Sequence, residues 1–160
     1  MDEGRKTLTR WTIEKEHENN QQDTTGDFSG LLNAVATGAK IIANQVNKGA
    51  LVGALGSASA GDHHGKVQRN LDVISNEVMI SQTEWTGHLA AIASEDMEDV
   101  YAIPERYQRG KYLLVFDPLD GSGNIDVNIS VGTIFSILRS PSPGAGASIE
   151  TFLQAGVQQI

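Results

Sequence analysis

Apolar positions recur at helical spacing in three stretches of the chain. Residues 8–18 are mostly polar and have a helical pattern, with Trp11 as the expected anchor. Between residues 31 and 46, and again from residue 71, apolar or small residues repeat at the spacing that places them on one helix face. The sequence therefore predicts three helices. The expected buried faces of the second and third are Leu31, Val35, Gly38, Ile42 and Val46, and Leu71, Ile74, Val78 and Trp85.

Short apolar runs predict strands in the second half of the chain. The runs 89–93 and 112–116 are typical of buried strands, whereas 129–138 predicts either a strand pair or one long strand kinked at Gly132. Because the helices precede the strands, we expect a layered α/β structure. The segments between these elements are predicted connectors: 97–109, which is charged, and 140–148, which is a low-complexity loop.

Small residues dominate the stretch that begins at Gly49. Glycine, alanine and serine bury little surface, so we expect a mobile loop over 49–65, and over about 49–70 at its widest. At the other end, apolar residues such as Phe152 and Ile160 occur up to the last position. We therefore expect the chain to be the N-terminal part of a longer protein.

Composition narrows the class of protein. The 160 residues suffice for one domain or part of one, with 39% hydrophobic residues for a core. The net charge of -8 argues against nucleic acid as a partner, because no basic stripe is present to neutralise phosphates. The absence of cysteine excludes disulfides and thiolate chemistry. No signal-like segment or bilayer-length apolar run occurs, which indicates no membrane partner and a cytoplasmic location.

The stretch 116–124 carries the strongest chemical signal. Asp117 and Asp120 flank a proline directly after a predicted buried strand, and the small residues 121–123 follow. Carboxylates at this position suit a divalent cation, and exposed backbone N–H groups suit a phosphate. The alternative is an ordinary turn, because Asp-Pro and Asp-Gly are common turn dipeptides.

A second acidic pair, Glu95 and Asp96, follows the other predicted buried strand. If the two strands are neighbours, four carboxylates converge at one edge of the sheet. Like charges at close range destabilise one another unless a cation neutralises them. The alternative is two unrelated acidic loop ends. The histidines lie away from these strands: His17, His63, His64 and His88.

An all-oxygen ligand set selects Mg²⁺ or Mn²⁺ over structural zinc. Two such ions about 3.5–4 Å apart would hold the attacking and leaving oxygens of a phosphoryl transfer. The repeated acidic pattern beside phosphate-compatible turn residues therefore favours metal-dependent phosphate chemistry.

The stretch Asp117–Asn124 and its continuation to Phe135 closely resemble the signature of class I fructose-1,6-bisphosphatases. These enzymes belong to the lithium-sensitive, metal-dependent sugar and inositol phosphatases. The Asp-Pro-Leu-Asp-Gly element occurs across that superfamily, whereas the continuation is specific to the bisphosphatases. The resemblance implies an α/β fold of the layered αβαβα sugar-phosphatase type, of which this chain is the N-terminal part on the metal and AMP side. It extends collinearly to Thr25–Asp27, Leu31–Asn33, Leu71–Asn76 and Gly110–Tyr112.

The resemblance implies hydrolysis of the 1-phosphate of fructose 1,6-bisphosphate to fructose 6-phosphate, with two or more Mg²⁺ or Mn²⁺ ions in a complete site. It assigns Asp72 and Asp96 to orienting and deprotonating the attacking water. The implied metal ligands are Glu95, Asp117, Asp120 and the carbonyl of Leu119, and the implied phosphate cradle is Asp120, Gly121, Ser122, Gly123 and Asn124.

The resemblance also implies an allosteric AMP site and, for the full-length protein, a homotetramer. A helix N-terminus after Gly26 suits an anionic phosphate, with Lys111 and Arg139 as counter-charges. The segment from Gly49 matches the family's mobile catalytic loop. The residues similar to the AMP pocket are Thr25, Gly26, Asp27, Phe28, Ser29, Lys111, Tyr112 and Arg139.

Three positions depart from the family pattern. Gly123 replaces a usual serine, Asp96 replaces the second glutamate of a pair, and Lys66 stands where an acid is expected before Asp72. These changes remove a hydroxyl, shorten a carboxylate side chain and weaken a third metal position. The family chains are about twice as long, so the half that binds the sugar is missing. Activity on sedoheptulose bisphosphate, a non-catalytic AMP-binding module and a structural Mg²⁺-binding domain are the alternatives.

Overall fold

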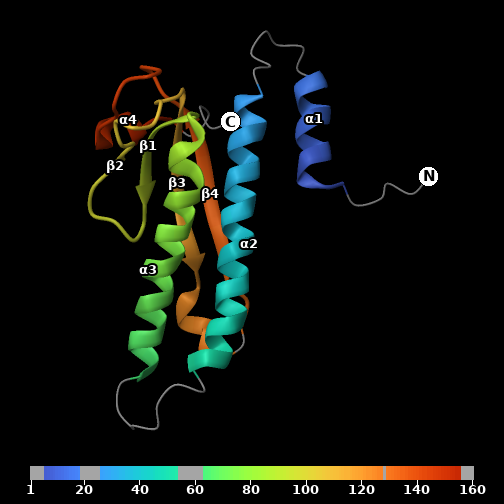
Figure 1. The fold of residues 1–160 in the computed structure, drawn as a ribbon, viewed down its shortest axis with the longest axis vertical. Helices are drawn as coiled ribbons and strands as arrows, with labels where there is room; N and C mark the ends of the chain where they lie inside the picture. The colour runs from blue at the N-terminus through green and yellow to red at the C-terminus, as the bar shows by residue number, and fades with distance from the viewer. Residues whose placement is uncertain (1–5, 19–25, 54–62, 128, 156–160) are drawn as a thin grey trace, which may run out of the picture.

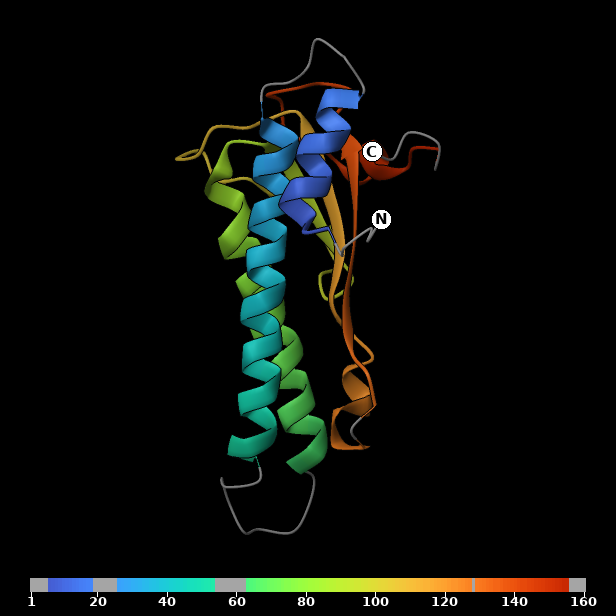
Figure 2. The same cartoon turned by 90° about the vertical axis from the view of Figure 1, so that its right-hand side faces the viewer.

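The computed structural model describes residues 6–18, 26–53, 63–127 and 129–155. Helices α2 (Asp27–Gly53) and α3 (His63–Thr83) lie side by side along one face of a four-stranded sheet (Figures 1 and 2). Helix α1 (Leu8–Glu18) lies against the first part of α2, where Thr9 Oγ1 contacts Asn33 Oδ1 at 3.4 Å. The layered α/β fold class is confirmed.

The sheet has the strand order β2-β1-β3-β4. Strands β1 (Leu89–Ser94) and β3 (Tyr112–Asp120) are parallel, so they begin at one edge of the sheet and end at the other. Strand β2 (Tyr101–Ala102) runs antiparallel to β1, and β4 (Gly132–Arg139) runs antiparallel to β3. The core lies between the helices and this sheet, and includes Leu31, Val35, Met79, Ile92 and Leu114.

The three helices were expected, but the buried face of α3 agrees with the prediction only in part: Leu71 is buried and Val78 packs against the core. Its buried positions are Leu71, Ser75, Met79 and Thr83, whereas Ile74 is 41% exposed. The predicted Trp85 falls in a 3-10 helix, η1 (Glu84–Thr86), and is 58% exposed. A close approach between α2 and α3 explains why Met79 is buried, because a Cβ at Gly38 of α2 would lie only 3.1 Å from Met79 Sδ. Met79 is therefore turned toward α2.

The strands at 89–93 and 112–116 are confirmed, and 132–139 forms one strand that starts at Gly132. The expected loop over 49–70 is wrong in extent. Helix α2 continues to Gly53 and α3 starts at His63, while 54–62 lies outside the described residues. Alanine, leucine, lysine, glutamine and arginine are good helix formers and extend both helices. The turn after Asp120 is in part a 3-10 helix, η2 (Ser122–Val127). A short helix, α4 (Ile149–Phe152), follows the loop at 140–148.

The connector 97–109 contains the short strand β2 and is held by two contacts to Glu84, the first residue of η1. The Tyr101 hydroxyl donates to Glu84 Oε2, and Arg106 Nη2 lies 3.6 Å from Glu84 Oε1. Burial, together with this hydrogen bond to a carboxylate, raises the pKa of Tyr101 to about 12. The contacts fix the path of the connector into residues 108–111, where β3 begins. None of the helices in the described ranges is both long and apolar enough to cross a bilayer.

Candidate functional site

The two predicted acidic pairs lie next to each other. Because β1 and β3 are parallel neighbours, with Ser94 opposite Phe116, the residues that follow them meet at one edge of the sheet. The Glu95 N–H donates to the Phe116 carbonyl at 3.1 Å, which extends the ladder by one residue. Glu95 is thereby placed beside Asp117, as the sequence predicted for neighbouring strands.

The carboxylates in this group perturb one another. A hydrogen bond between the Glu95 and Asp117 side chains raises the pKa of Glu95, and repulsion from Asp117, Asp96 and Asp120 adds to it. Burial raises the pKa of Asp96, and the charges of Asp72 and Asp117 raise it further. All five carboxylates assigned by sequence therefore lie close enough to interact. A bound cation would relieve this repulsion.

The donor chemistry of this acidic group fits a hard divalent cation, because every candidate ligand is an oxygen. Among the residues that the structure describes, these oxygens are not already arranged around a metal position. In the described part of the chain, no three Asp, Glu or His side chains stand together in the arrangement of a metal site. Binding a metal here would therefore require these side chains to rearrange.

The path of the chain around Asp117 differs from the expected strand end. Strand β3 continues to Asp120, and β4 pairs with it on both sides of an irregularity between Asp117 and Asp120. Pro118 lies at this irregularity, where its missing N–H costs no ladder bond. Asp117 Oδ1 accepts a hydrogen bond from the Leu119 N–H at 3.0 Å, which fixes the carboxylate against the backbone. Thr133 Oγ1 donates to the Pro118 carbonyl at 3.0 Å and holds the same segment to β4.

The chain turns sharply at Gly121, directly after the second aspartate. Gly121 has a φ of 79°, in the left-handed region, and the Asn124 N–H donates to its carbonyl at 2.8 Å. The expected phosphate cradle therefore lies at the start of η2. Gly121 precedes this helix, and Ser122 and Gly123 are its first two residues.

We expect Gly121→Ala to lower stability by about 1–2 kcal/mol, because an L side chain in the left-handed region is strained. For a chain of this size, the unfolding midpoint would fall by about 2–8 °C in total. Differential scanning calorimetry measures the change. Gly132→Ala is the matched control, because Gly132 has no left-handed φ and nothing lies within 4 Å of the added Cβ. Equal midpoints for the two variants would contradict the strained turn.

A second group of predicted residues meets at the opposite edge of the sheet. Asp27 is the first residue of α2, and Lys111 directly precedes β3. Asp27 Oδ2 lies 3.2 Å from Lys111 Nζ. The rings of Phe28 and Tyr112 meet edge to face at 6.0 Å between centroids. Lys111 Nζ and Arg139 Cζ both approach the Tyr112 ring, at 5.6 and 5.9 Å from its centroid. The structure therefore brings Asp27, Phe28, Lys111, Tyr112 and Arg139 together. Thr25 lies outside the described residues.

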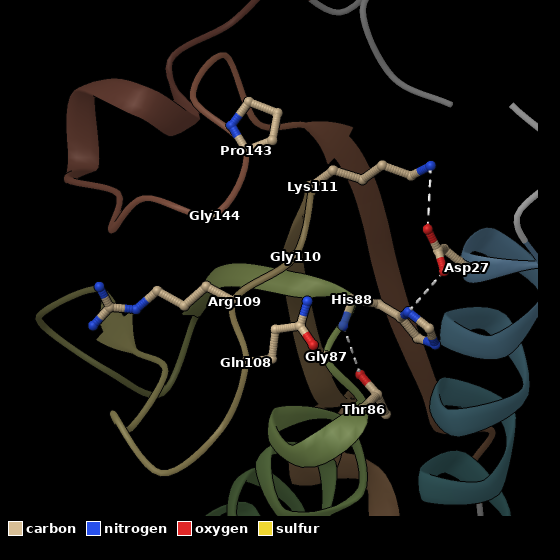
Figure 3. A pocket seen from close by; sticks show the side chains of 10 residues that line it. All are labelled: Asp27, Thr86, Gly87, His88, Gln108, Arg109, Gly110, Lys111, Pro143 and Gly144. Atoms are coloured by element: carbon tan, nitrogen blue, oxygen red, sulfur yellow. Dashed lines mark hydrogen bonds and ion pairs between the residues drawn. The ribbon is translucent and has the colours of Figure 1, made fainter.

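Sequence reasoning missed His88, which directly precedes β1. Its Nδ1 lies 3.5 Å from Asp27 Oδ1, and a Cβ at Gly30 would lie 2.5 Å from its Nε2. Only a glycine at position 30 allows the imidazole to lie against the first turn of α2. No local pattern marks His88, because its partners are distant in sequence. Figure 3 shows His88, Asp27 and Lys111 on one side of a pocket whose other walls include Gln108, Arg109 and Gly144.

Comparison with known proteins identifies relatives of this arrangement. A family model described as "Fructose-1-6-bisphosphatase, N-terminal domain" matches residues 6–160. The Leishmania major fructose-1,6-bisphosphatase in holo form is similar, with a TM-score of 0.76, 30% identity and coverage of 98% of this chain and 46% of that chain. For its apo form the TM-score is 0.71 and the identity 29%, with coverage of 98% and 45%. The chain thus spans about half the length of these relatives.

Proposed function

Because the chain belongs to the fructose-1,6-bisphosphatase family, we propose that it supplies the metal- and 1-phosphate-binding half of a sugar bisphosphatase. The reaction is metal-dependent hydrolysis of the 1-phosphate of fructose 1,6-bisphosphate to fructose 6-phosphate and phosphate. One observation supports the proposal: the parallel strands β1 and β3 bring Glu95 close enough to Asp117 for the two carboxylates to perturb each other, next to the turn at Gly121.

In this proposal, Glu95, Asp117, Asp120 and the Leu119 carbonyl hold two or more Mg²⁺ or Mn²⁺ ions. When bound, such ions lower the pKa of a water molecule and neutralise charge on the phosphoryl group. The irregularity in β3 between Asp117 and Asp120 interrupts the regular alternation of side chains between the two faces of the sheet. Both aspartates stay at the same edge of the sheet, where they could bind the same ions. The hydrogen bond from Leu119 N–H keeps one Asp117 oxygen oriented.

The chain's own groups complete the chemistry. The amides of Gly121, Ser122 and Gly123 would donate to the phosphoryl oxygens, with the Asn124 side chain beside them. Asp72 on α3 and Asp96 after β1 lie close enough for their charges to interact, and would accept the proton of the attacking water. Asp96 stands where the family has the longer glutamate, so Asp72 would carry more of this role.

The group at the other edge of the sheet supports a regulatory part of the proposal. Asp27, Phe28, Lys111, Tyr112 and Arg139 converge there, as expected for a site that binds AMP. On the family alone, we also propose a homotetramer for the full-length protein and a cytoplasmic location. Sedoheptulose bisphosphate is the alternative substrate, because the residues that would discriminate the sugar lie in the half of the relatives that this chain does not match.

Two measurements test the proposal. Isothermal titration of the 160-residue chain with Mn²⁺ measures metal binding directly. Phosphate release from fructose 1,6-bisphosphate, with and without Mg²⁺, is then measured on a chimera in which this chain replaces the matching half of the Leishmania major enzyme. We expect Mn²⁺ binding and Mg²⁺-dependent release. A folded chain that binds no Mn²⁺ would contradict the metal site even if the chimera failed to fold.

A further inference from the structure

The loop between β4 and α4 contains a repeated dipeptide that the proposed reaction does not use. Two of the four prolines in the sequence directly follow a serine, as Ser140-Pro141 and Ser142-Pro143. Because proline has no backbone N–H, a partner whose pocket at this position offers no acceptor favours proline over other residues. Proline-directed protein kinases recognise a serine in this context. Both dipeptides are therefore candidate phosphorylation sites.

The structure distinguishes the two serines by their exposure. Ser140 is buried, with 7% of its surface exposed. Its N–H donates to the Lys111 carbonyl at 2.8 Å, and its hydroxyl accepts from the Ser142 N–H at 3.3 Å. A kinase could reach this hydroxyl only after the loop had separated from the start of β3. Ser142 is exposed, as are the other residues from 141 to 146, so its side chain is accessible in the folded chain.

The turn that contains Ser142 can open without disturbing the core. The Ser142 carbonyl accepts from the Ala145 N–H at 3.1 Å, and the Gly144 N–H donates to the Gly110 carbonyl at 2.9 Å. Gly144 has a φ of 78°, and an added Cβ there would have nothing within 4 Å. Since residues 141–146 are exposed, opening the turn moves no buried side chain. The serine could therefore enter the active site of another enzyme while the rest of the chain stays folded.

A cation already lies beside this loop, where it could bind a phosphate. The turn keeps the Cα atoms of Ser142 and Ala145 within about 7 Å of each other, and Gly146 follows directly. A Cβ at Gly146 would lie 3.5 Å from Arg109 Nη1. Arg109 Nη2 donates to the Ile103 carbonyl at 3.3 Å, so the guanidinium is held next to the loop. Figure 3 shows Arg109 and Gly144 on the wall of the same pocket.

We propose that Ser142 is phosphorylated by a proline-directed protein kinase and that Arg109 binds the attached phosphate. A base of the kinase takes the proton of the Ser142 hydroxyl. The serine oxygen then bonds to the γ-phosphorus of ATP while the bond from that phosphorus to ADP breaks. The planar guanidinium of Arg109 suits the product, because it can donate two parallel hydrogen bonds to one phosphate.

The charge of the phosphate gives the modification its expected effect. Phosphoserine carries a charge of about -1.5 to -2, and the stretch 140–148 contains no acidic residue. Glu150, the nearest acid in the sequence, already accepts from the Ser148 hydroxyl at 2.5 Å. A phosphate paired with Arg109 would therefore fasten the loop to the connector 97–109. The proposal goes beyond hydrolysis of a sugar phosphate, because it requires neither the metals nor the sugar.

Phosphorylation of the folded 160-residue chain tests the site. The chain is incubated with ATP and a purified proline-directed kinase of the mitogen-activated class, and mass spectrometry measures the extent and position of modification. We expect one phosphate per chain, on Ser142. Pro143→Ala should slow its incorporation by at least about tenfold, whereas the matched control Pro141→Ala should leave the rate unchanged. No incorporation, phosphate on Ser140 instead, or equal rates for the two variants would overturn the assignment.

A titration of the phosphorylated chain by ³¹P NMR tests the role of Arg109. The second pKa of a free phosphoserine is about 6. A guanidinium beside the phosphate stabilises its dianion, so we expect a lower pKa in the parent chain. Arg109→Gln should return the pKa to about 6. Arg106→Gln, which removes the same charge at a side chain that is 67% exposed, should leave it lowered. An ordinary pKa in the parent, or a lowered one in Arg109→Gln, would exclude Arg109 as the partner.

Discussion

Replacing Asp117 with asparagine is expected to weaken Mn²⁺ binding to the chain by more than about 100-fold and to reduce Mg²⁺-dependent phosphate release by at least the same factor. The substitution removes the charge that a hard cation requires. It keeps the oxygen that accepts the Leu119 N–H, so the irregularity in β3 should persist. Calorimetry on the chain and phosphate release by the chimera measure the two effects.

Asp99→Asn is the matched control for this prediction, because it makes the same change at an exposed position in the connector. We expect it to keep both metal affinity and phosphate release within about twofold of the parent. The circular dichroism spectrum should be the same for all three proteins. If Asp117→Asn bound Mn²⁺ as tightly as the control does, the Asp117 carboxylate would not be a metal ligand. The acidic residues at this edge of the sheet would then have another role.

The position of the acidic group Glu95, Asp96, Asp117 and Asp120 could be predicted because its signals are local in sequence. An apolar run followed by acids occurs at Glu95 and again at Asp117, and the two runs only had to be parallel neighbours for the acids to meet. The continuation of β3 through Asp120 was not predictable in this way. It depends on pairing with β4, which lies beyond the next turn and imposes the strand on an aspartate-proline sequence.

The buried face of α3 shows a different limit. The hydroxyl of Thr83 donates to the Met79 carbonyl at 2.8 Å, so this polar residue is satisfied within its own helix and is fully buried. A pattern that counts apolar residues therefore selects Ile74 and misses Thr83. His88 was missed for a related reason, since its role follows from contacts with Asp27 and Gly30 in a distant helix.

Gly110→Ala is expected to destabilise the chain by more than about 3 kcal/mol, a large part of the roughly 5–15 kcal/mol that stabilises a typical domain. A Cβ at this position would lie 2.2 Å from both the carbonyl carbon and the oxygen of His88, and 2.5 Å from the Gly87 oxygen. These are backbone atoms of the two residues that directly precede β1, so no side-chain rotation relieves the clash. Denaturant unfolding should show the midpoint reduced, with a thermal shift of at least about 6 °C.

The clash at Gly110 also links stability to the pocket. The Gly110 and Tyr112 N–H groups donate to the Leu89 and His88 carbonyls, at 2.9 and 3.0 Å, and these bonds set the distance between Lys111 and His88. Separating the two strands would therefore disturb the partners of Asp27 as well as the sheet. Gly146→Ala is the control, because its Cβ would meet only the Arg109 guanidinium at an ordinary 3.5 Å. If Gly110→Ala unfolded at the same midpoint as this control, the close approach of the two strands would be wrong, and the pocket geometry derived from it would be wrong too.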